Sequence, residues 1–183
     1  MKKADFDWGR LSLQDRTLAG DILGYYREPD LVIAPDGNPY LYRWHVIPHS
    51  LKDHAGVFFH IQVSDDPERP LHDHPWDNTS TILSGGYNEI WNPWPDHYPS
   101  EAIEDAATIR HLRTHDMIFR KAKEAHRLLL PKKFSYTMTL FSTGPTLRQW
   151  GFWTKDGWVP ADTLVETLPD GRSIFKTEEV KHG

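Results

Sequence analysis

The chain contains no cysteine among its 183 residues. Disulfide bonds, thiolate metal ligands and cysteine nucleophiles are therefore excluded, and any metal site has to use His, Asp, Glu or Asn side chains. The sequence also lacks an uninterrupted apolar run of about 18 residues, the length that a membrane-spanning helix needs. Its N-terminal segment carries two lysines but no apolar stretch behind them. No signal peptide is predicted, so a cytoplasmic protein is the default expectation.

An overall excess of basic residues is absent as well, because the formal net charge is −5. One segment is locally basic, and clustered basic side chains can contact phosphate backbones. Acidic residues lie close to it, however, and strands would spread its charges over several sides. We therefore interpret these positions as surface and do not expect nucleic acid as a partner. They are Arg110, Arg113, Arg120, Lys121, Lys123, Arg127, Lys132 and Lys133.

The segments that are present predict an all-β protein with one short N-terminal helix. Ser12 and Asp15 fit a helix start, and Leu18 and Ile22 follow at helical spacing. Beyond them, short runs of β-branched and aromatic residues recur about every 8–12 residues between turn signals, which is typical of a sandwich or barrel. We expect a helical extension over residues 1–30, a β-barrel domain over 31–167 and a loosely held polar tail over 168–183.

Two histidines one residue apart stand out in the segment LHDHPWDNTSTILSGGY, residues 71–87. Side chains at positions i and i+2 of a strand project from the same face, so the imidazoles of His72 and His74 can reach one point. Such a pair is half of a metal site. A pair of solvent-exposed histidines on a strand edge is the alternative.

A third imidazole is available from His126. The segment around it predicts two strands joined by a turn at residues 121–124, with His126 and Leu128 facing inward and Arg127 facing outward. His126 is therefore the best candidate for a third ligand.

These residues resemble the two motifs of the cupin superfamily. The first motif is His-x-His, then usually Glu, then Gly, and the matching positions are His72, His74, Asn78 and Gly85. The second motif ends in His and is similar to residues 116–126, although Lys121 and Lys123 stand where Pro and Gly are usual. The resemblance implies a cupin jelly roll, also called a double-stranded β-helix, with a metal held by His72, His74 and His126.

Residues 40–160 are also similar to a group of bacterial and phage cupin proteins without an assigned reaction. The shared motifs are His-Asp-His-Pro-Trp at residues 72–76, Gly-Gly-Tyr at 85–87, Thr-Gly-Pro at 143–145 and Arg-x-Trp-Gly-Phe at 148–152. This similarity supports the jelly-roll fold and implies little about the chemistry.

The residue at position 78 makes a three-histidine site the expected form. An Asn carbonyl is a poorer ligand than the usual carboxylate, so water or substrate would fill the remaining positions, with Asn78 beside the substrate. Such a centre resembles the three-histidine iron site of the thiol dioxygenases. Those enzymes carry a Ser, His and Tyr series where this chain has Thr139, Phe141 and Thr143, so oxidation of cysteine is not predicted.

Further site residues are predicted from strand alternation. His60 and Gln62 share one face and would bind substrate if that face lines the barrel; otherwise Phe59 and Ile61 form the apolar face and His60 is exposed. Tyr87 and Glu89 form a second pair, for which we consider catalytic roles, with Glu89 as a general base or a fourth ligand. A surface glutamate at a strand end is the alternative for Glu89.

Arg148 and Trp150 share a face of a later strand and are candidates for binding substrate. An arginine opposite a cationic centre can clamp a carboxylate in bidentate fashion, although an arginine paired with a surface acid is common. His111 and His115 have a helical metal spacing, but their segment predicts strand and turn, so we interpret them as surface residues.

These observations predict a metal-dependent cupin enzyme that acts on a small polar or anionic molecule. Fe(II) is the first choice of metal, since open positions can bind substrate and dioxygen in a dioxygenase-type oxidation; Zn, Mn and Ni also accept imidazole. The alternatives are a non-catalytic ligand-binding or assembly protein with a structural metal, and a cupin isomerase, lyase or metal-free epimerase. A homodimer formed through sheet edges is left open.

Overall fold

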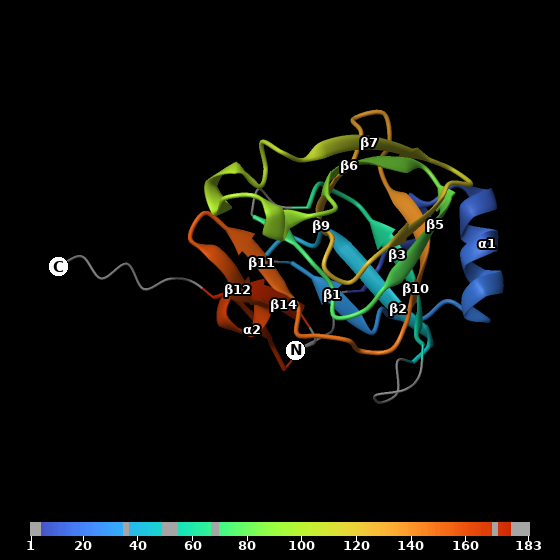
Figure 1. The fold of residues 1–183 in the computed structure, drawn as a ribbon. Coiled ribbons are helices and arrows are strands. Elements are labelled where there is room, and N and C mark those ends of the chain that lie inside the picture. Colours follow the sequence, from blue (N-terminus) through green and yellow to red (C-terminus); the bar gives the residue numbers. More distant parts are fainter. Residues whose placement is uncertain (1–4, 35–36, 49–54, 67–69, 170–171, 177–183) are drawn as a thin grey trace.

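The computed structural model describes residues 5–34, 37–48, 55–66, 70–169 and 172–176, which form two β-sheets and one longer helix (Figure 1). The larger sheet has the strand order β13-β14-β1-β2-β3-β10-β5-β8, and the smaller one β12-β11-β4-β9-β6-β7. Among these residues, no helix combines the length and the apolarity required to cross a membrane.

The strands of the two sheets have the following bounds. The larger sheet contains β1 (Leu31–Ile33), β2 (Leu41–Ile47), β3 (Val57–Gln62), β5 (Asn78–Ser84), β8 (Met117–Arg120), β10 (Thr137–Thr143), β13 (Val165–Thr167) and β14 (Arg172–Phe175). The smaller sheet contains β4 (Leu71–His72), β6 (Gly86–Asn92), β7 (Thr108–Arg113), β9 (Ala125–Leu129), β11 (Gly151–Thr154) and β12 (Gly157–Pro160). The helices are α1 (Leu13–Leu23) and α2 (Ala161–Leu164), with short 3₁₀ turns at Trp8–Arg10, Pro95–His97 and Ser100–Ala102.

The connections between the strands define the fold. Between β3 and β11 the chain crosses to the opposite sheet at every step except the β6–β7 hairpin. This winding of one chain between two facing sheets is the double-stranded β-helix, or cupin jelly roll, so the predicted fold class is confirmed.

The helix α1 packs against the larger sheet and explains the pattern of β3. Ser12 caps the helix by accepting from the backbone N–H of Asp15, as predicted, and the helix ends at Gly24, whose φ of 77° is left-handed. The core beneath α1 includes Trp44, Phe59 and Ile61. Because this face of β3 is covered, both of its faces are buried.

The opposite face of β3 lines an internal cavity. His60 and Gln62 are both buried and both border that cavity. Of the two arrangements considered for this strand, the structure therefore has His60 and Gln62 inside the barrel and Phe59 and Ile61 beneath the helix.

The C-terminal part of the described chain adds strands to the barrel. β14 pairs in parallel with β1 and antiparallel with β13. Residues 172–175, which we expected in a loosely held tail, are therefore part of the larger sheet. Residues 170–171 and 177–183 of the expected tail lie outside the described residues.

The bend before β6 and the close packing of β6 against β7 require the two glycines before Tyr87. Gly85 has a φ of 80°, and a Cβ on Gly86 would lie 2.4 Å from the backbone oxygen of Leu112 on the neighbouring strand. Only a residue without a side chain allows β6 and β7 to approach this closely.

We expect Gly86→Ala to lower the free energy of unfolding by about 1–3 kcal/mol, because the added methyl group has no space between the two strands. Gly144→Ala is the matched control, since its Cβ would have an ordinary contact at 3.5 Å from the backbone oxygen of Asp77. Urea denaturation of the three proteins checks the difference, and equal stabilities would contradict this steric explanation.

Candidate metal centre

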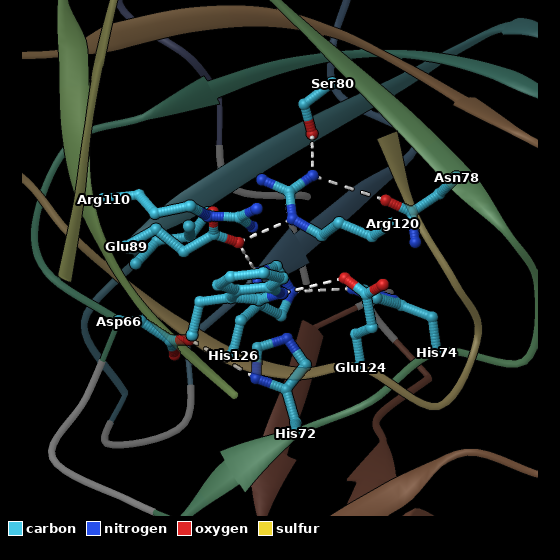
Figure 2. Close-up of polar contacts among 12 residues, drawn as sticks. Asp66, His72, His74, Asn78, Ser80, Glu89, Arg110, Arg120, Glu124 and His126 are labelled. Carbon is cyan, nitrogen blue, oxygen red and sulfur yellow. Dashed lines mark hydrogen bonds and ion pairs between the residues drawn. The ribbon is translucent and has the colours of Figure 1, made fainter. Parts of the chain in front are cut away.

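Three histidines converge on one wall of the cavity (Figure 2). His72 ends β4 and lies directly opposite His126 on β9, while His74 follows two residues after His72. Their ligand nitrogens all lie within 4.8 Å of one another, and the Nε2 atoms of His74 and His126 are 2.8 Å apart. The strand β4 ends at His72, earlier than the sequence predicts, yet His74 beyond its end reaches the same point.

A buried carboxylate orients His126. Glu89 on β6 is 0% exposed, and its Oε1 accepts a hydrogen bond of 2.6 Å from Nδ1 of His126. With Nδ1 engaged in this way, Nε2 of His126 is the nitrogen directed at the other imidazoles. A carboxylate in this position fixes the tautomer of a ligand histidine and raises its basicity.

Two arginines hold Glu89 in its ionised form. Nε of Arg120 donates to Oε1 at 2.6 Å, while Nε and Nη2 of Arg110 donate to Oε2 at 3.0 and 2.6 Å. Burial would raise the pKa of Glu89, but Arg120 and the hydrogen bond from His126 outweigh it, so the pKa lies well below its usual range. Glu89 is therefore a permanent anion behind the imidazoles.

The imidazoles of His74 and His126 are neutral at pH 7. Burial lowers the pKa of His74 well below its ordinary value, and the neighbouring His126, Arg120 and Arg43 lower it further. Burial also lowers the pKa of His126, although Glu89 opposes this effect. Neutral imidazole is the form that coordinates metal ions.

The surroundings of the three histidines fit a divalent metal ion. His72 also has a carboxylate behind it, since Oδ2 of Asp66 lies 3.6 Å from its Nδ1. Two of the three histidines thus have an acidic partner on one ring nitrogen, and all three present a nitrogen to one point. The group of His72, His74 and His126 can hold a divalent ion without rearrangement of strands.

The cavity in front of the histidines has a volume of about 410 Å³, within the range of small-molecule sites. Trp76 stacks on His74 with an angle of 17° between the rings, and Phe141 contacts His74 from a strand of the larger sheet. The predicted site residues that border the cavity are His60, Gln62, His72, His74, Tyr87, His126 and Trp150.

Three other predicted site residues do not border the cavity. Glu89 lies behind His126 rather than beside it as a fourth ligand. Asn78 is buried, and its side chain donates to the backbone oxygen of Trp76 at 3.4 Å and accepts from Arg120 at 3.5 Å. Arg148 forms an ion pair of 3.0 Å with Asp73 and lies over the ring of Trp158.

Asp73 is a buried residue that the sequence analysis missed. Its carboxylate accepts from the backbone N–H of Gly151 at 2.7 Å and from the indole N–H groups of Trp158 and Trp153 at 2.9 and 3.2 Å. Burial raises the pKa of Asp73 to about 6, against the effect of Gly151 and Arg148. Its place between His72 and His74 was the available signal, because a residue between two inward positions has to point to the other side.

Arg120 was also misjudged from the sequence. We interpreted the basic segment as surface, but Arg120 is 0% exposed and donates to Glu89 and to Ser80. That interpretation is wrong for this residue, since a buried carboxylate compensates its charge. His111 and His115 are both exposed, as predicted.

No protein-family model matches the chain, and no curated protein matches it. Solved structures with similar folds are proteins of the cupin fold. A DMSP lyase from Ruegeria pomeroyi is 13% identical over 76% of this chain and 66% of its own, with a TM-score of 0.49. The hydroxypropylphosphonic acid epoxidase from S. wedmorenis is 13% identical over 74% and 76%, with a TM-score of 0.44. A Klebsiella pneumoniae protein with a double-stranded β-helix domain is 16% identical over 66% and 90%, with a TM-score of 0.45.

We expect Glu89→Gln to weaken binding of a divalent metal by about 10- to 100-fold, because the amide no longer supplies a charged partner to His126. Competition with a chromogenic chelator measures the affinity. Glu104→Gln is the matched control, since Glu104 also pairs with an arginine, Arg127 at 3.3 Å, but lies on the surface. Equal affinities of the two folded variants would contradict the role of Glu89.

We expect Asp73→Asn to lower the free energy of unfolding by about 3 kcal/mol, because it leaves Arg148 without its anion and turns an amide N–H₂ toward donors. Thermal and urea unfolding check this value. Asp156→Asn, in the exposed turn between β11 and β12, is the control and should unfold like the unchanged protein. If both variants behave alike, Asp73 does not hold this hairpin.

Proposed function

We propose that this protein is a metal-dependent enzyme that oxidises a small organic molecule in the cavity, with Fe(II) held by His72, His74 and His126. The observation that carries this proposal is the position of the three imidazoles on the wall of a cavity of about 410 Å³. All three imidazoles border the cavity, so a metal ion bound to them would face it. Catalytic metal sites, unlike closed structural ones, have such an open side.

When bound, Fe(II) would supply open coordination positions for substrate and dioxygen. The residues of the chain prepare that centre. The ion pairs of Glu89 with Arg110 and Arg120 keep its carboxylate anionic, so that Nδ1 of His126 remains a donor and Nε2 remains a lone-pair ligand. Glu89 is thus a positioning residue rather than a general base.

Tyr87 is the protein group best suited to donate a hydrogen bond to a bound molecule. It borders the cavity and is 2% exposed. Burial raises the pKa of its hydroxyl, despite the opposing effect of Arg120, so the phenol stays protonated at neutral pH. A neutral phenol in this position can orient a substrate or transfer a proton.

Aromatic side chains pack beside the imidazoles and reduce their contact with water. Trp76 covers His74, Phe141 packs against the same imidazole, and the ring of Trp150 meets His72 edge-on at 6.4 Å between centroids. A cavity walled in this way favours chemistry that water would interrupt.

The main alternative is a ligand-binding protein with a structural metal. It predicts a coordination shell closed by protein groups, whereas the proposed enzyme has exchangeable positions. Replacement of the metal by Co(II) and titration with azide separates the two, because only an open centre changes its visible spectrum when azide binds.

We expect the protein purified without chelators to contain stoichiometric divalent metal, and we expect His72→Ala, His74→Ala and His126→Ala to lose it. Each variant removes one of three ligands and leaves too few donors for tight binding. Elemental analysis by mass spectrometry measures the content. His111→Ala is the control, because His111 is exposed and contacts Asn88 on the outer surface.

Retention of metal in all three variants would rule out this centre. If the protein without bound metal keeps its full activity, the metal-free epimerase is favoured instead.

A further inference from the structure

Arg43 is a cationic residue of the cavity that the sequence analysis did not single out. It lies on β2, opposite His60 of β3, and borders the same cavity as the three histidines. Its Nε donates to Nε2 of His60 at 2.8 Å, and its guanidinium lies 5.0 Å from the ring centre of Phe58. These contacts hold the side chain in place.

No carboxylate pairs with Arg43 among the described residues, in contrast to other arginines of the chain. Arg110 and Arg120 pair with Glu89, and Arg148 pairs with Asp73. Burial lowers the pKa of Arg43 to about 10, so the group remains positively charged at pH 7. Arg43 is half-buried, and a charge that is partly removed from water without a counter-ion is unfavourable, which makes Arg43 a place where the cavity favours an anion.

The acidic side chains that border the cavity serve other partners. Asp66 lies beside His72, and the carboxylate of Asp162 accepts from Gln149 at 3.3 Å. Neither is among the groups that contact the guanidinium of Arg43. Within the part of the chain that the structure describes, no carboxylate is paired with Arg43, so a molecule that enters the cavity can supply the counter-ion.

His60 sets the direction and the charge of this site. Burial lowers its pKa well below the ordinary value, and Arg43 lowers it further, so the imidazole is neutral and accepts from Nε. Within the described ranges no hydrogen bond engages the two Nη atoms of Arg43, so they are available to a ligand. The pair carries one positive charge, which matches a monoanion better than a dianion.

The anion site lies close to the metal centre. Phe141 contacts His60 at 5.3 Å and His74 at 5.5 Å between ring centroids, so one aromatic ring separates the two groups. The walls around Arg43 include Leu31, Ile33 and Leu41. A short molecule with an apolar skeleton can therefore contact both Arg43 and the histidines of the metal centre.

We propose that Arg43 binds the carboxylate of a small monocarboxylic substrate, whose reacting end lies at His72, His74 and His126. The inference deepens the proposed function and rests on it for the metal end. The planar fork of arginine matches the two oxygens of a carboxylate, while Nε is already engaged by His60. This assigns to Arg43 the role that the sequence suggested for Arg148.

The test uses the metal-free protein and pairs of probes with the same shape but different charge, namely benzoate with benzamide and butyrate with butyramide. Calorimetry and quenching of tryptophan fluorescence measure binding, since Trp76 and Trp150 border the cavity. We expect the carboxylates to bind at least about tenfold more tightly than the amides, and we expect Arg43→Gln to abolish that preference.

Matched variants make the outcome decisive. Arg113→Gln, on the exposed end of β7, and Arg148→Gln should keep the preference. Arg43→Lys, which keeps the charge but not the fork, should weaken it and serves if Arg43→Gln does not fold. Three results would overturn the proposal: absence of a preference in the unchanged protein, loss of the preference only in Arg148→Gln, or an unchanged preference in a folded Arg43→Gln. If Arg43→Gln does not fold, an unchanged preference in Arg43→Lys has the same meaning.

Two further experiments distinguish the ways in which the proposal can fail. Methylphosphonate binding more tightly than the carboxylates would overturn the choice of a carboxylate. His126→Ala should keep the carboxylate preference, because Arg43 does not contact it. If the protein prefers carboxylates but never binds metal, the proposed function fails, and so does the part of the inference that places the reacting end at the histidines. If the protein binds metal but does not prefer carboxylates, only the role of Arg43 is refuted.

Discussion

The buried carboxylate of Glu89 is the constraint on which the site depends. It lies on β6 of the smaller sheet, and one of its partners, Arg120, comes from β8 of the larger sheet, so their ion pair joins the two layers. An ionised carboxylate without solvent requires full compensation. Arg110, His126 and Arg120 supply it together, and the compensation fixes the ring of His126. One set of interactions thus stabilises the barrel and orients a metal ligand.

The fold and the histidine group followed from periodicity and motif spacing. Alternation placed His72 and His74 on one side, and the turn before β9 placed His126 opposite them. Alternation alone did not decide which side of β3 is inside, because α1 buries the outer face too. A strand with two buried faces has no polar side to mark solvent, so the position of His60 became known only from the packing of the helix.

The buried charges were less predictable, because their partners lie far apart in the sequence. On β8, Met117 and Phe119 are 69% and 55% exposed while Arg120 is fully buried, the reverse of the usual pattern. Nothing near Arg120 in sequence indicates Glu89, which neutralises it. The same holds for the ion pair of Asp73 with Arg148. The two residues are brought together by the fold, and the residues next to each in the sequence do not indicate its partner.

The distribution of charge inside the barrel argues for the kind of molecule that it receives. Glu89 is outweighed by two arginines behind the imidazoles, and the carboxylate of Asp66 lies 3.6 Å from Nδ1 of His72. Arg43 adds a positive charge on the facing wall, and a divalent ion would add two more. The interior is therefore electropositive from both ends, and a neutral or cationic ligand would leave that charge uncompensated. An anion whose carboxylate lies at Arg43 compensates the charge there, while the rest of the molecule extends toward the histidines.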